Sequence, residues 1–348
     1  MFELCRELEQ VLPETRFFVY SRGPIVLPST SICWTTRIEP STVASKMPRL
    51  LWLKLRCGVL CKQDHLDVFW AAGSLLPSLP QQVKTVLTVY DVNHHVVPRT
   101  MPVANLWSYR LFFDRDVRRA DTVLTISEGT AARLYKYVGR SADAVVRPSV
   151  SDAFRPCTES DIQERLDRYR IRRPYILAVA TWEPRKNLEL LVRTYLELKR
   201  DGLLPQYQLV LVGGQGWKDA RLRILVQEAV RDLVRPLGFI DDYDLPALYA
   251  GAEVFVYPSI YEGFGIPVLE ACRCQTKVVA TDLPEIREVG CDGVIYVAPD
   301  AQGLRDGILS AVKSERRTRQ TGDVASWKDG AKKMASIFLA GRACSTCE

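Results

Sequence analysis

Short apolar runs alternate with amphipathic stretches along the second half of the chain. Tyr175–Ala180, Gln208–Val212 and Val254–Tyr257 are almost entirely apolar, which is typical of strands buried on both faces of a sheet. Because predicted strands and helices alternate regularly along the chain, the pattern predicts a parallel sheet with helices on both faces. We expect further strands near 236–240, 277–280 and 294–297, and helices over 188–200 (with Asn187 as N-cap), 219–233, 244–250, 266–274 and 284–289.

The first half shows the same alternation less regularly. We expect strands at 17–20, 68–70, 86–89 and 122–126, helices at 2–11, 47–63, 102–118 and 128–138, and a linker at 147–156. The pattern therefore predicts an α/β protein with two Rossmann-like domains, over residues 1–155 and 156–325. A closing segment, 326–348, is expected to hold one more helix.

The chain as written opens in a helix. A doubly wound domain normally opens with a central strand and a Gly-rich turn that lead into that helix. We therefore expect the first domain to lack its first strand. Two explanations stay open, a translation start upstream of Met1 and a variant of the fold without this strand, and we favour the first.

Composition narrows the class of protein. Of the 348 residues, 47% are hydrophobic and 25% are charged, as in ordinary globular domains. A net charge of +6 suits an anionic ligand or membrane surface but is too small to indicate a nucleic-acid-binding protein. The first residues carry acids and no apolar core, so we expect no export signal and a cytoplasmic protein. The ten cysteines are irregularly spaced, with a single CxxC pair at Cys344 and Cys347, so we expect reduced thiols and no metal site.

The most informative segment is Glu262-Gly-Phe-Gly-Ile-Pro-Val-Leu-Glu270, which follows the predicted strand 254–257. Its two glycines allow the backbone to approach a ligand, and Pro267 suits the first turn of a helix. Free N–H groups at a helix start, with the positive end of the helix dipole, bind anions. The segment therefore predicts a phosphate site, with Glu270 close enough to reach a sugar hydroxyl. The alternative is an ordinary helix with two surface acids.

A second segment, Thr181-Trp-Glu-Pro-Arg-Lys-Asn187, also follows a predicted strand. The adjacent cations Arg185 and Lys186 can face a diphosphate through charge-assisted hydrogen bonds. A solvated turn is the alternative. Ligands of open α/β sheets gather at the carboxyl ends of the strands, so the shared position of the two segments favours a joint site.

With these segments the chain resembles glycosyltransferase family 4, whose members have the GT-B fold. Glu262–Glu270 matches the E-x7-E motif of that family. The segments that follow the family's order and spacing are Glu183–Asn187, Val212–Gly214, Leu237–Asp242, Leu248–Ala252, Ala280–Glu285, Thr125–Thr130 and Thr88–Asp91. The resemblance covers about residues 65–330 and is strongest with the mannosyltransferase-like branch of bacterial polysaccharide assembly.

The resemblance implies roles for the residues of the donor site. Lys186 and Arg185 would hold and neutralise the donor diphosphate, Glu270 would hold the ribose hydroxyls, and Glu262 would lie beside the transferred sugar. The remaining donor-binding residues that it implies are Phe264, Gly265 and Ile266 around the sugar and phosphate, Gly213 and Gly214 at the base pocket, and Thr181.

The resemblance also implies an acceptor side in the first domain, with Tyr90, Asp91 and His94 as candidates. The family usually has His-Asp where this chain has Tyr90-Asp91. It implies a retaining hexosyltransferase that needs no metal cofactor and uses a nucleotide diphospho-sugar, with GDP-mannose as our choice. The expected acceptor is a glycan or lipid-linked glycan in polysaccharide or lipopolysaccharide assembly.

Residues 47–62 interleave basic residues with Trp and Leu. Such a helix suits a peripheral contact with an anionic membrane, here on the inner face, while an ordinary helix packed on the sheet is the alternative. For the whole protein, two other functions stay open. One is a catalytically impaired sugar-nucleotide-binding protein, suggested by Tyr90 and the absent Gly-rich turn. The other is a different GT-B enzyme, such as a nucleotide-sugar epimerase or a phosphorylase.

Overall fold

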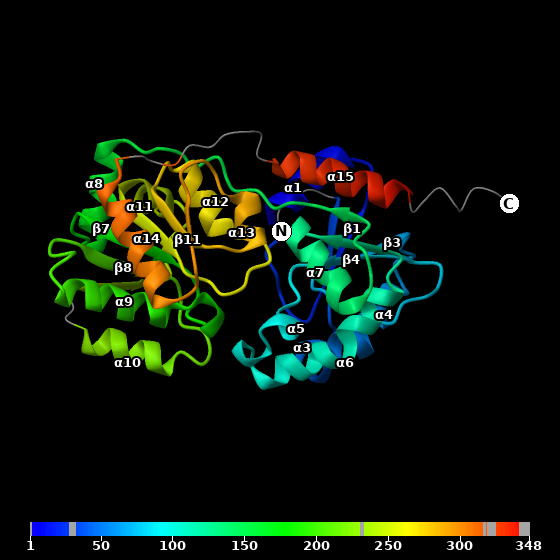
Figure 1. The fold of residues 1–348 in the computed structure, drawn as a ribbon. Coiled ribbons are helices and arrows are strands. Elements are labelled where there is room, and N and C mark those ends of the chain that lie inside the picture. The colour runs from blue at the N-terminus through cyan, green and yellow to red at the C-terminus, as the bar shows by residue number, and fades with distance from the viewer. Residues whose placement is uncertain (1, 28–32, 230–232, 316–317, 319–324, 341–348) are drawn as a thin grey trace. The chain divides into compact units, whose positions relative to one another are not determined.

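The computed structural model describes residues 2–27, 33–229, 233–315, 318 and 325–340. It divides into two compact units, each with a parallel β-sheet and covering helices (Figure 1). The first unit comprises Met1–Val92, Ala104–Ser149 and Val324–Glu348, and the second comprises Asn93–Val103 and Val150–Asp323. This confirms the predicted α/β class with two sheet-bearing halves.

The second unit is built on a six-stranded sheet in the order β12-β11-β10-β7-β8-β9. All pairs are parallel. The strand order changes direction between β7 and β10, so these two strands flank the switch point at which open α/β sheets bind ligands. The strands are β7 (Tyr175–Val179), β8 (Gln208–Val212), β9 (Val234–Gly238), β10 (Val254–Tyr257), β11 (Val278–Thr281) and β12 (Ile295–Val297).

Helices cover this sheet and bury its apolar strands. Leu191 of α9, Leu209 of β8 and Ile308 of α14 are fully buried in one core cluster. The helices are α8 (Glu159–Tyr169), α9 (Leu188–Arg200), α10 (Ala220–Glu228), α11 (Leu245–Gly251), α12 (Ile266–Arg273), α13 (Pro284–Val289) and α14 (Ala301–Lys313), with a 3-10 turn at Pro184–Lys186.

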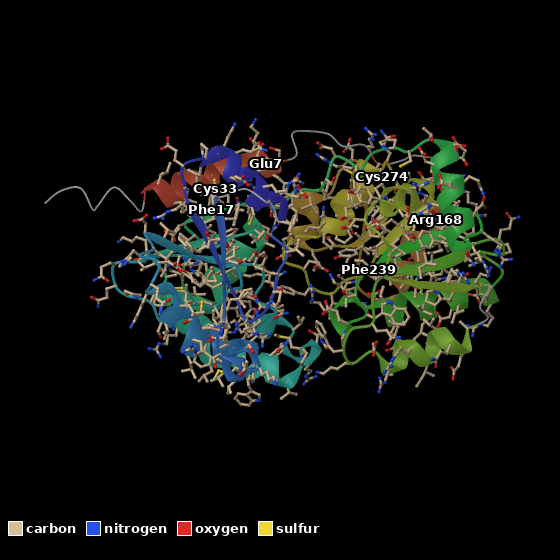
Figure 2. The ribbon with its side chains drawn as sticks, turned by 180° about the vertical axis from the view of Figure 1, so that it is seen from behind. Glu7, Phe17, Cys33, Arg168, Phe239 and Cys274 are labelled. Atoms are coloured by element: carbon tan, nitrogen blue, oxygen red, sulfur yellow. A yellow bond between two sulfur atoms is a disulfide. The ribbon has the colours of Figure 1, made fainter. Side chains whose placement is uncertain are left out.

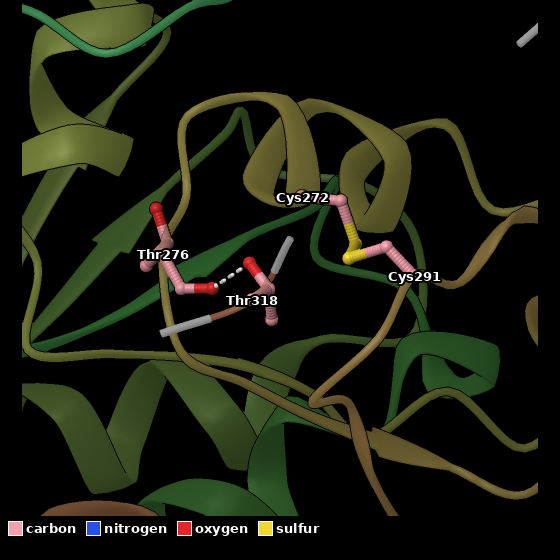
Figure 3. The surroundings of a disulfide bond; sticks show 4 residues. All are labelled: Cys272, Thr276, Cys291 and Thr318. Atoms are coloured by element: carbon pink, nitrogen blue, oxygen red, sulfur yellow. Dashed lines mark hydrogen bonds between the residues drawn. A yellow bond between two sulfur atoms is a disulfide. The ribbon is translucent and has the colours of Figure 1, made fainter. Parts of the chain in front are cut away.

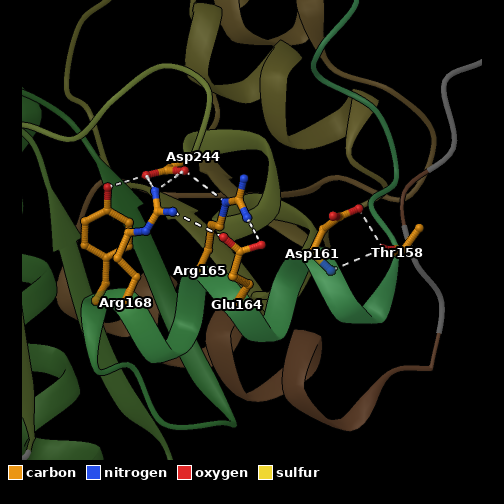
Figure 4. Close-up of polar contacts among 7 residues, drawn as sticks. Thr158, Asp161, Glu164, Arg165, Arg168 and Asp244 are labelled. Atoms are coloured by element: carbon orange, nitrogen blue, oxygen red, sulfur yellow. Dashed lines mark hydrogen bonds and ion pairs between the residues drawn. The ribbon is translucent and has the colours of Figure 1, made fainter.

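The sequence pattern did not predict the helix α8. Hydrogen bonds to the buried carboxylate of Asp244 hold this helix against the second unit. Asp244 accepts hydrogen bonds from Arg165, Arg168 and Tyr169 at 2.6 to 3.1 Å (Figure 4). Burial raises the pKa of Asp244, but Tyr169 and the two guanidinium groups lower it below its usual range overall. A surface helix rich in charge is thus held by one carboxylate from the loop before α11.

Three other details differ from the prediction. The helix α14 was missed. The helix predicted over 219–233 ends at Glu228, and part of that range lies outside the described residues. Asn187 does stand before α9, but it has a left-handed backbone (φ 55°) and its side chain does not cap the helix.

The first unit holds two parallel sheets. One is β3-β4-β5-β6 and the other is the pair β1-β2. Figure 2 marks Phe17 of β1 beside Cys33, whose carbonyl accepts the Phe17 N–H at 2.7 Å. The strand β2, with the sequence Trp-Thr-Thr-Arg-Ile, was not predicted because it lacks an apolar run. The strands are β1 (Phe17–Ser21), β2 (Trp34–Ile38), β3 (Val68–Ala71), β4 (Lys84–Val89), β5 (Thr122–Thr125) and β6 (Ala144–Val145).

The helix that ends the described chain belongs to the first unit. Met334 of α15 is buried with Leu4 and Leu8 of α1, so the first and last described helices share one core. The helices of this unit are α1 (Phe2–Val11), α2 (Thr42–Ser45), α3 (Arg49–Trp52), α4 (Gly58–Cys61), α6 (Val103–Arg119), α7 (Glu128–Val138) and α15 (Trp327–Ala340), with a π-helical turn at Leu53–Cys57 between α3 and α4; α5 (Asn93–Val96) falls in the second unit.

A cavity of about 860 Å³ lies between the two sheets of the first unit. Among the described residues, β1 pairs with β2 alone and β3 pairs with β4 alone. The cavity is therefore bordered by β1 of one sheet and β3 of the other.

The expectation of reduced thiols is wrong for one pair of cysteines. Cys272 of α12 and Cys291, two residues after α13, form a disulfide with their Cα atoms 6.1 Å apart (Figure 3). The two residues are 19 positions apart in sequence, and they meet only because α12 and α13 pack together. Cys344 and Cys347 lie outside the described residues. None of the helices in the described part of the chain is long and apolar enough to cross a membrane.

Candidate active site

The two predicted segments meet at the switch point of the second unit. The 3-10 turn 184–186 follows β7, and the loop 258–265 follows β10. The two are joined directly, because the N–H of Ile260 donates to the carbonyl oxygen of Arg185 at 2.9 Å. Parallel neighbours end at the same edge of a sheet, so this contact follows from the pairing of β7 with β10.

A buried charge cluster forms where the two loops meet. Glu262, which is 5% exposed, accepts hydrogen bonds from Lys186 Nζ at 2.7 Å and from Arg185 at 3.0 Å. The hydroxyl of Tyr257 donates to the same carboxylate at 2.8 Å. Arg185 also donates to the buried Glu183 at 2.6 Å. Two cations are thus held by two carboxylates, with the cation side chains 12–16% exposed.

The cluster keeps Glu262 ionised. Burial by itself raises the pKa of this carboxyl, but the adjacent Lys186 and Arg185 lower it below its usual range overall. Burial and the neighbouring carboxylate raise the pKa of the Tyr257 hydroxyl well above its usual value. The cluster therefore brings a neutral phenol, two carboxylates and two cations together.

The loop leads into α12 through a backbone position that suits glycine. Gly265 is the N-cap of α12 and has φ of 102°, in the left-handed region that other residues rarely adopt. Phe264 is buried and Ile266 is exposed at the first helical position. Pro267 has no N–H, and the N–H of Val268 donates to the carbonyl oxygen of Gly265 at 3.0 Å. In the first turn of α12 it is therefore the N–H of Ile266 that can donate to an anion.

Glu270 lies one turn into α12 and is bound to a buried tyrosine. The hydroxyl of Tyr249 donates to the Glu270 carboxylate at 2.8 Å. Burial raises the pKa of Glu270 to about 7, against the lowering effect of that hydrogen bond. This carboxyl therefore changes charge near neutral pH.

Gly213 closes the side of the site beside β8. It has φ of 128°, and a Cβ atom at this position would overlap the carbonyl oxygen of Ala180. A Cβ at Gly214 would meet no atom within 4 Å. Thr181 is exposed between β7 and the 3-10 turn. Only glycine therefore lets the end of β8 pass this close to the end of β7.

The structure adds three residues that the motifs did not assign. Tyr257 and Glu183 complete the charge cluster, and Tyr249 orients Glu270. Buried tyrosines usually hydrogen-bond their hydroxyl, but no sequence spacing shows which acid will accept it.

The acceptor-side candidates are divided between the units. Tyr90 and Asp91 follow β4 in the first unit and line its cavity. Burial raises the pKa of Tyr90 to about 12, so it stays a neutral phenol. His94 is buried in α5, which belongs to the second unit. A shared site formed by Tyr90, Asp91 and His94 with the charge cluster of the second unit stays a prediction.

Residues 162–328 match the family described as Glycosyl transferases group 1. O-antigen chain mannosyltransferase B of Escherichia coli is 32% identical over 261 residues, which is 73% of this chain and 67% of that relative. The chain belongs to the group 1 glycosyltransferases. It is a hexosyltransferase of glycosyltransferase family 4, and it uses a nucleotide-sugar donor and an acceptor.

Two further proteins are similar over most of their length. A GDP-mannose-dependent alpha-(1-6)-phosphatidylinositol monomannoside mannosyltransferase of Mycolicibacterium smegmatis is 27% identical over 333 residues, 88% of this chain and 82% of the relative. The structure of WaaG, a glycosyltransferase involved in lipopolysaccharide biosynthesis, matches with a TM-score of 0.70 and 15% identity, covering 99% of this chain and 95% of that one. At this identity the likeness concerns the fold, which is GT-B.

Proposed function

We propose that the protein transfers mannose from GDP-mannose, with retention of configuration, to a hydroxyl of a growing glycan or lipid-linked glycan in polysaccharide or lipopolysaccharide assembly. One observation carries this proposal. Lys186 and Arg185 converge on Glu262, in the loop that leads into α12, at the switch point between β7 and β10. Cations and a helix start at one point form a site for a diphosphate.

In this proposal the site acts on the leaving group. Lys186 and Arg185 turn from Glu262 toward the diphosphate as the bond to the sugar breaks, and the backbone of Phe264–Ile266 donates to its oxygens. Fixed charges and N–H groups aimed at developing charge are usually the largest part of catalysis. The two side-chain cations would neutralise the negative charge of the departing diphosphate, a role that a divalent metal ion has in other enzymes. Glu262 would then lie beside the transferred sugar.

We assign the donor's nucleoside to the region of Glu270, one turn into α12. Glu270 would accept hydrogen bonds from the ribose hydroxyls, while Gly213 and Gly214 leave room for the base. The relatives support mannose and guanine, since one is named as a mannosyltransferase and another as GDP-mannose-dependent.

Isothermal calorimetry with GDP-mannose and UDP-glucose tests the donor assignment. Glu270→Ala should weaken donor binding by about 1.5–3 kcal/mol, the range for a hydrogen bond to a charged group. Glu197→Ala, a change of an exposed acid on α9, is the matched control and should have no effect. Equal donor affinity in both variants would remove Glu270 from the site. Tight GDP-mannose binding without mannosyl transfer to any glycan acceptor would favour the impaired binding protein.

We also propose that residues 47–62 touch an anionic membrane surface on the cytoplasmic side. Leu51, Leu55 and Val59 form one exposed stripe at helical spacing, with exposed fractions of 44%, 57% and 45%. Exposed Arg49 and Lys62 flank the stripe. Apolar side chains beside cations suit the interface of an anionic bilayer.

Flotation with vesicles tests this contact. Binding to phosphatidylcholine vesicles should be weak and should rise when a third of the lipid is phosphatidylglycerol. Leu55→Asp should abolish the rise, whereas Ile224→Asp, at a similarly exposed position on α10 (54%), should keep it. Equal flotation of both variants would contradict the contact.

A further inference from the structure

Tyr257 connects two oppositely charged members of the charge cluster in the second unit. Its hydroxyl donates to Glu262 Oε1 at 2.8 Å and accepts from Lys186 Nζ at 2.9 Å. Lys186 Nζ also donates to the same Glu262 oxygen at 2.7 Å, so the three groups form a closed triangle of hydrogen bonds. The phenol is the neutral corner of this triangle.

The sheet fixes the position of the Tyr257 hydroxyl. Tyr257 ends β10, which lies between β7 and β11, and its side chain is fully buried. Its ring stacks with that of Phe255 on the same strand, with the ring centroids 5.9 Å apart. Lys186, by contrast, carries a long flexible side chain and lies on a 3-10 turn. Tyr257 is therefore the fixed point of the triangle, and the ammonium group is the part that needs to be held.

The proton of Tyr257 is directed to the carboxylate. A phenol has one O–H donor and an oxygen that can accept. Burial and the neighbouring carboxylate raise the pKa of Tyr257 well above its usual value, so the hydroxyl keeps its proton. Because ionised Glu262 can only accept, the proton points to Glu262 and a lone pair points to Lys186. Tyr257 thus binds the ammonium group without neutralising its charge.

Lys186 keeps one N–H group for a ligand. An ammonium group has three donors. Among the described residues its acceptors are Tyr257 and Glu262, and the Lys186 side chain is 12% exposed. A phosphate oxygen can take the third donor and can also replace Glu262 as the charged partner, since both are anions. The bond to the neutral hydroxyl is compatible with either partner.

We propose that Tyr257 is a positioning residue, whose hydroxyl anchors the ammonium group of Lys186 at the edge of the sheet while its bond to Glu262 is exchanged for one to the donor diphosphate. The exchange rests on the proposed function, whereas the anchoring also applies to the protein without ligand. A carboxylate in place of the hydroxyl would neutralise Lys186, and an apolar ring would leave it held by Glu262 alone. With the hydroxyl, the charge of Lys186 is in place before the leaving group develops its own charge, as electrostatic catalysis requires.

Reductive methylation of the ligand-free full chain, read by mass spectrometry, tests the anchoring. Tyr257→Phe should raise the rate at Lys186 about fivefold, which corresponds to the loss of one hydrogen bond. The control is Tyr195→Phe, since the hydroxyl of this fully buried tyrosine donates to the carbonyl oxygens of Tyr207 and Leu233. The control should leave the rate at Lys186 unchanged. An unchanged rate at Lys186 in Tyr257→Phe would overturn the proposal.

Lys277 separates the anchoring from a general loosening of the unit. Its ammonium group is paired with Glu253, and its side chain is 9% exposed, close to the value for Lys186. The rate at Lys277 should stay the same in Tyr257→Phe. A rise at both lysines would show that the whole unit loosens, and it would also overturn the proposal.

A double-mutant cycle tests the link with the diphosphate. Calorimetry uses GDP or UDP, whichever the wild type binds more tightly, together with its nucleoside. Tyr257→Phe should weaken nucleotide binding about fivefold and leave nucleoside binding unchanged. When Lys186→Ala is already present, the same change should have no further effect. An equal loss with and without Lys186 would overturn the role in diphosphate binding. If the wild type binds neither nucleotide, the proposed function is wrong, and the labelling at Lys186 still decides the anchoring.

Discussion

Replacing Glu262 with glutamine should destabilise the second unit when no donor is bound. The change removes the negative charge that faces Lys186 and Arg185, whose side chains are only 12% and 16% exposed. Breaking a buried ion pair costs about 3–5 kcal/mol, because a charge remains without its partner. The glutamine carbonyl still accepts one hydrogen bond, so we expect a loss of about 3 kcal/mol, at the lower end of that range.

Scanning calorimetry of the full chain measures this loss. For a unit of this size, 3 kcal/mol corresponds to a fall of about 6–12 °C in the melting midpoint. The control is Glu189→Gln, which breaks an exposed pair with Arg193 and should cost less than about 1 kcal/mol. The pKa of Glu262 is lowered in the folded state, so its stabilisation is present above the unfolded value of about 4.3 and is lost as pH falls further.

The same variant tests the chemistry of the site. A nucleoside diphosphate should restore most of the lost stability, because its phosphate oxygens take the hydrogen bonds that Glu262 gave up. The difference in melting midpoint between wild type and Glu262→Gln should therefore shrink at saturating GDP. A midpoint within about 2 °C of wild type without ligand would refute the buried-pair reasoning. A difference that GDP leaves unchanged would refute phosphate binding by Lys186 and Arg185.

Three other outcomes are expected. Lys186→Ala should weaken GDP-mannose binding in calorimetry far more than guanosine binding, and an equal loss for both ligands would indicate a misfolded turn. Because burial raises the pKa of Glu270 to about 7 and the ionised form is the stronger acceptor, donor affinity should rise about tenfold from pH 6 to pH 8. Glu270→Gln should make that profile flat, and a persistent slope would assign it to another group. Gly213→Ala should lower the melting midpoint by several degrees through overlap with Ala180, whereas Gly214→Ala should not, and equal midpoints would contradict the overlap.

Local patterns were sufficient to predict the elements that carry the proposed donor site. The run Val254–Tyr257, the left-handed position at Gly265 and the proline at the start of α12 are adjacent in sequence, and each acts on the backbone next to it. Strand burial on both faces leaves continuous apolar runs, so the central strands of both units were found with small errors in their bounds. The edge strand β2 was missed because three of its five residues are polar.

The partners of the charged groups were decided by the tertiary structure. Lys186 and Glu262 are 76 residues apart, and only the pairing of β7 with β10 makes them neighbours. Asp244 and Arg168 are also 76 residues apart, and Cys272 and Cys291 are 19 residues apart. Both pairs meet only through the packing of the second unit.

The sequence alone therefore determined the α/β class, the order of most of its elements and the strand, loop and helix that carry the proposed phosphate site, since backbone periodicity and sterics act over a few residues. It could not show that Glu262 neutralises the two cations, that Tyr249 holds Glu270, or that a cavity separates β1 from β3. These contacts depend on which strands lie side by side, and that is set by the packing of the whole sheet and its helices.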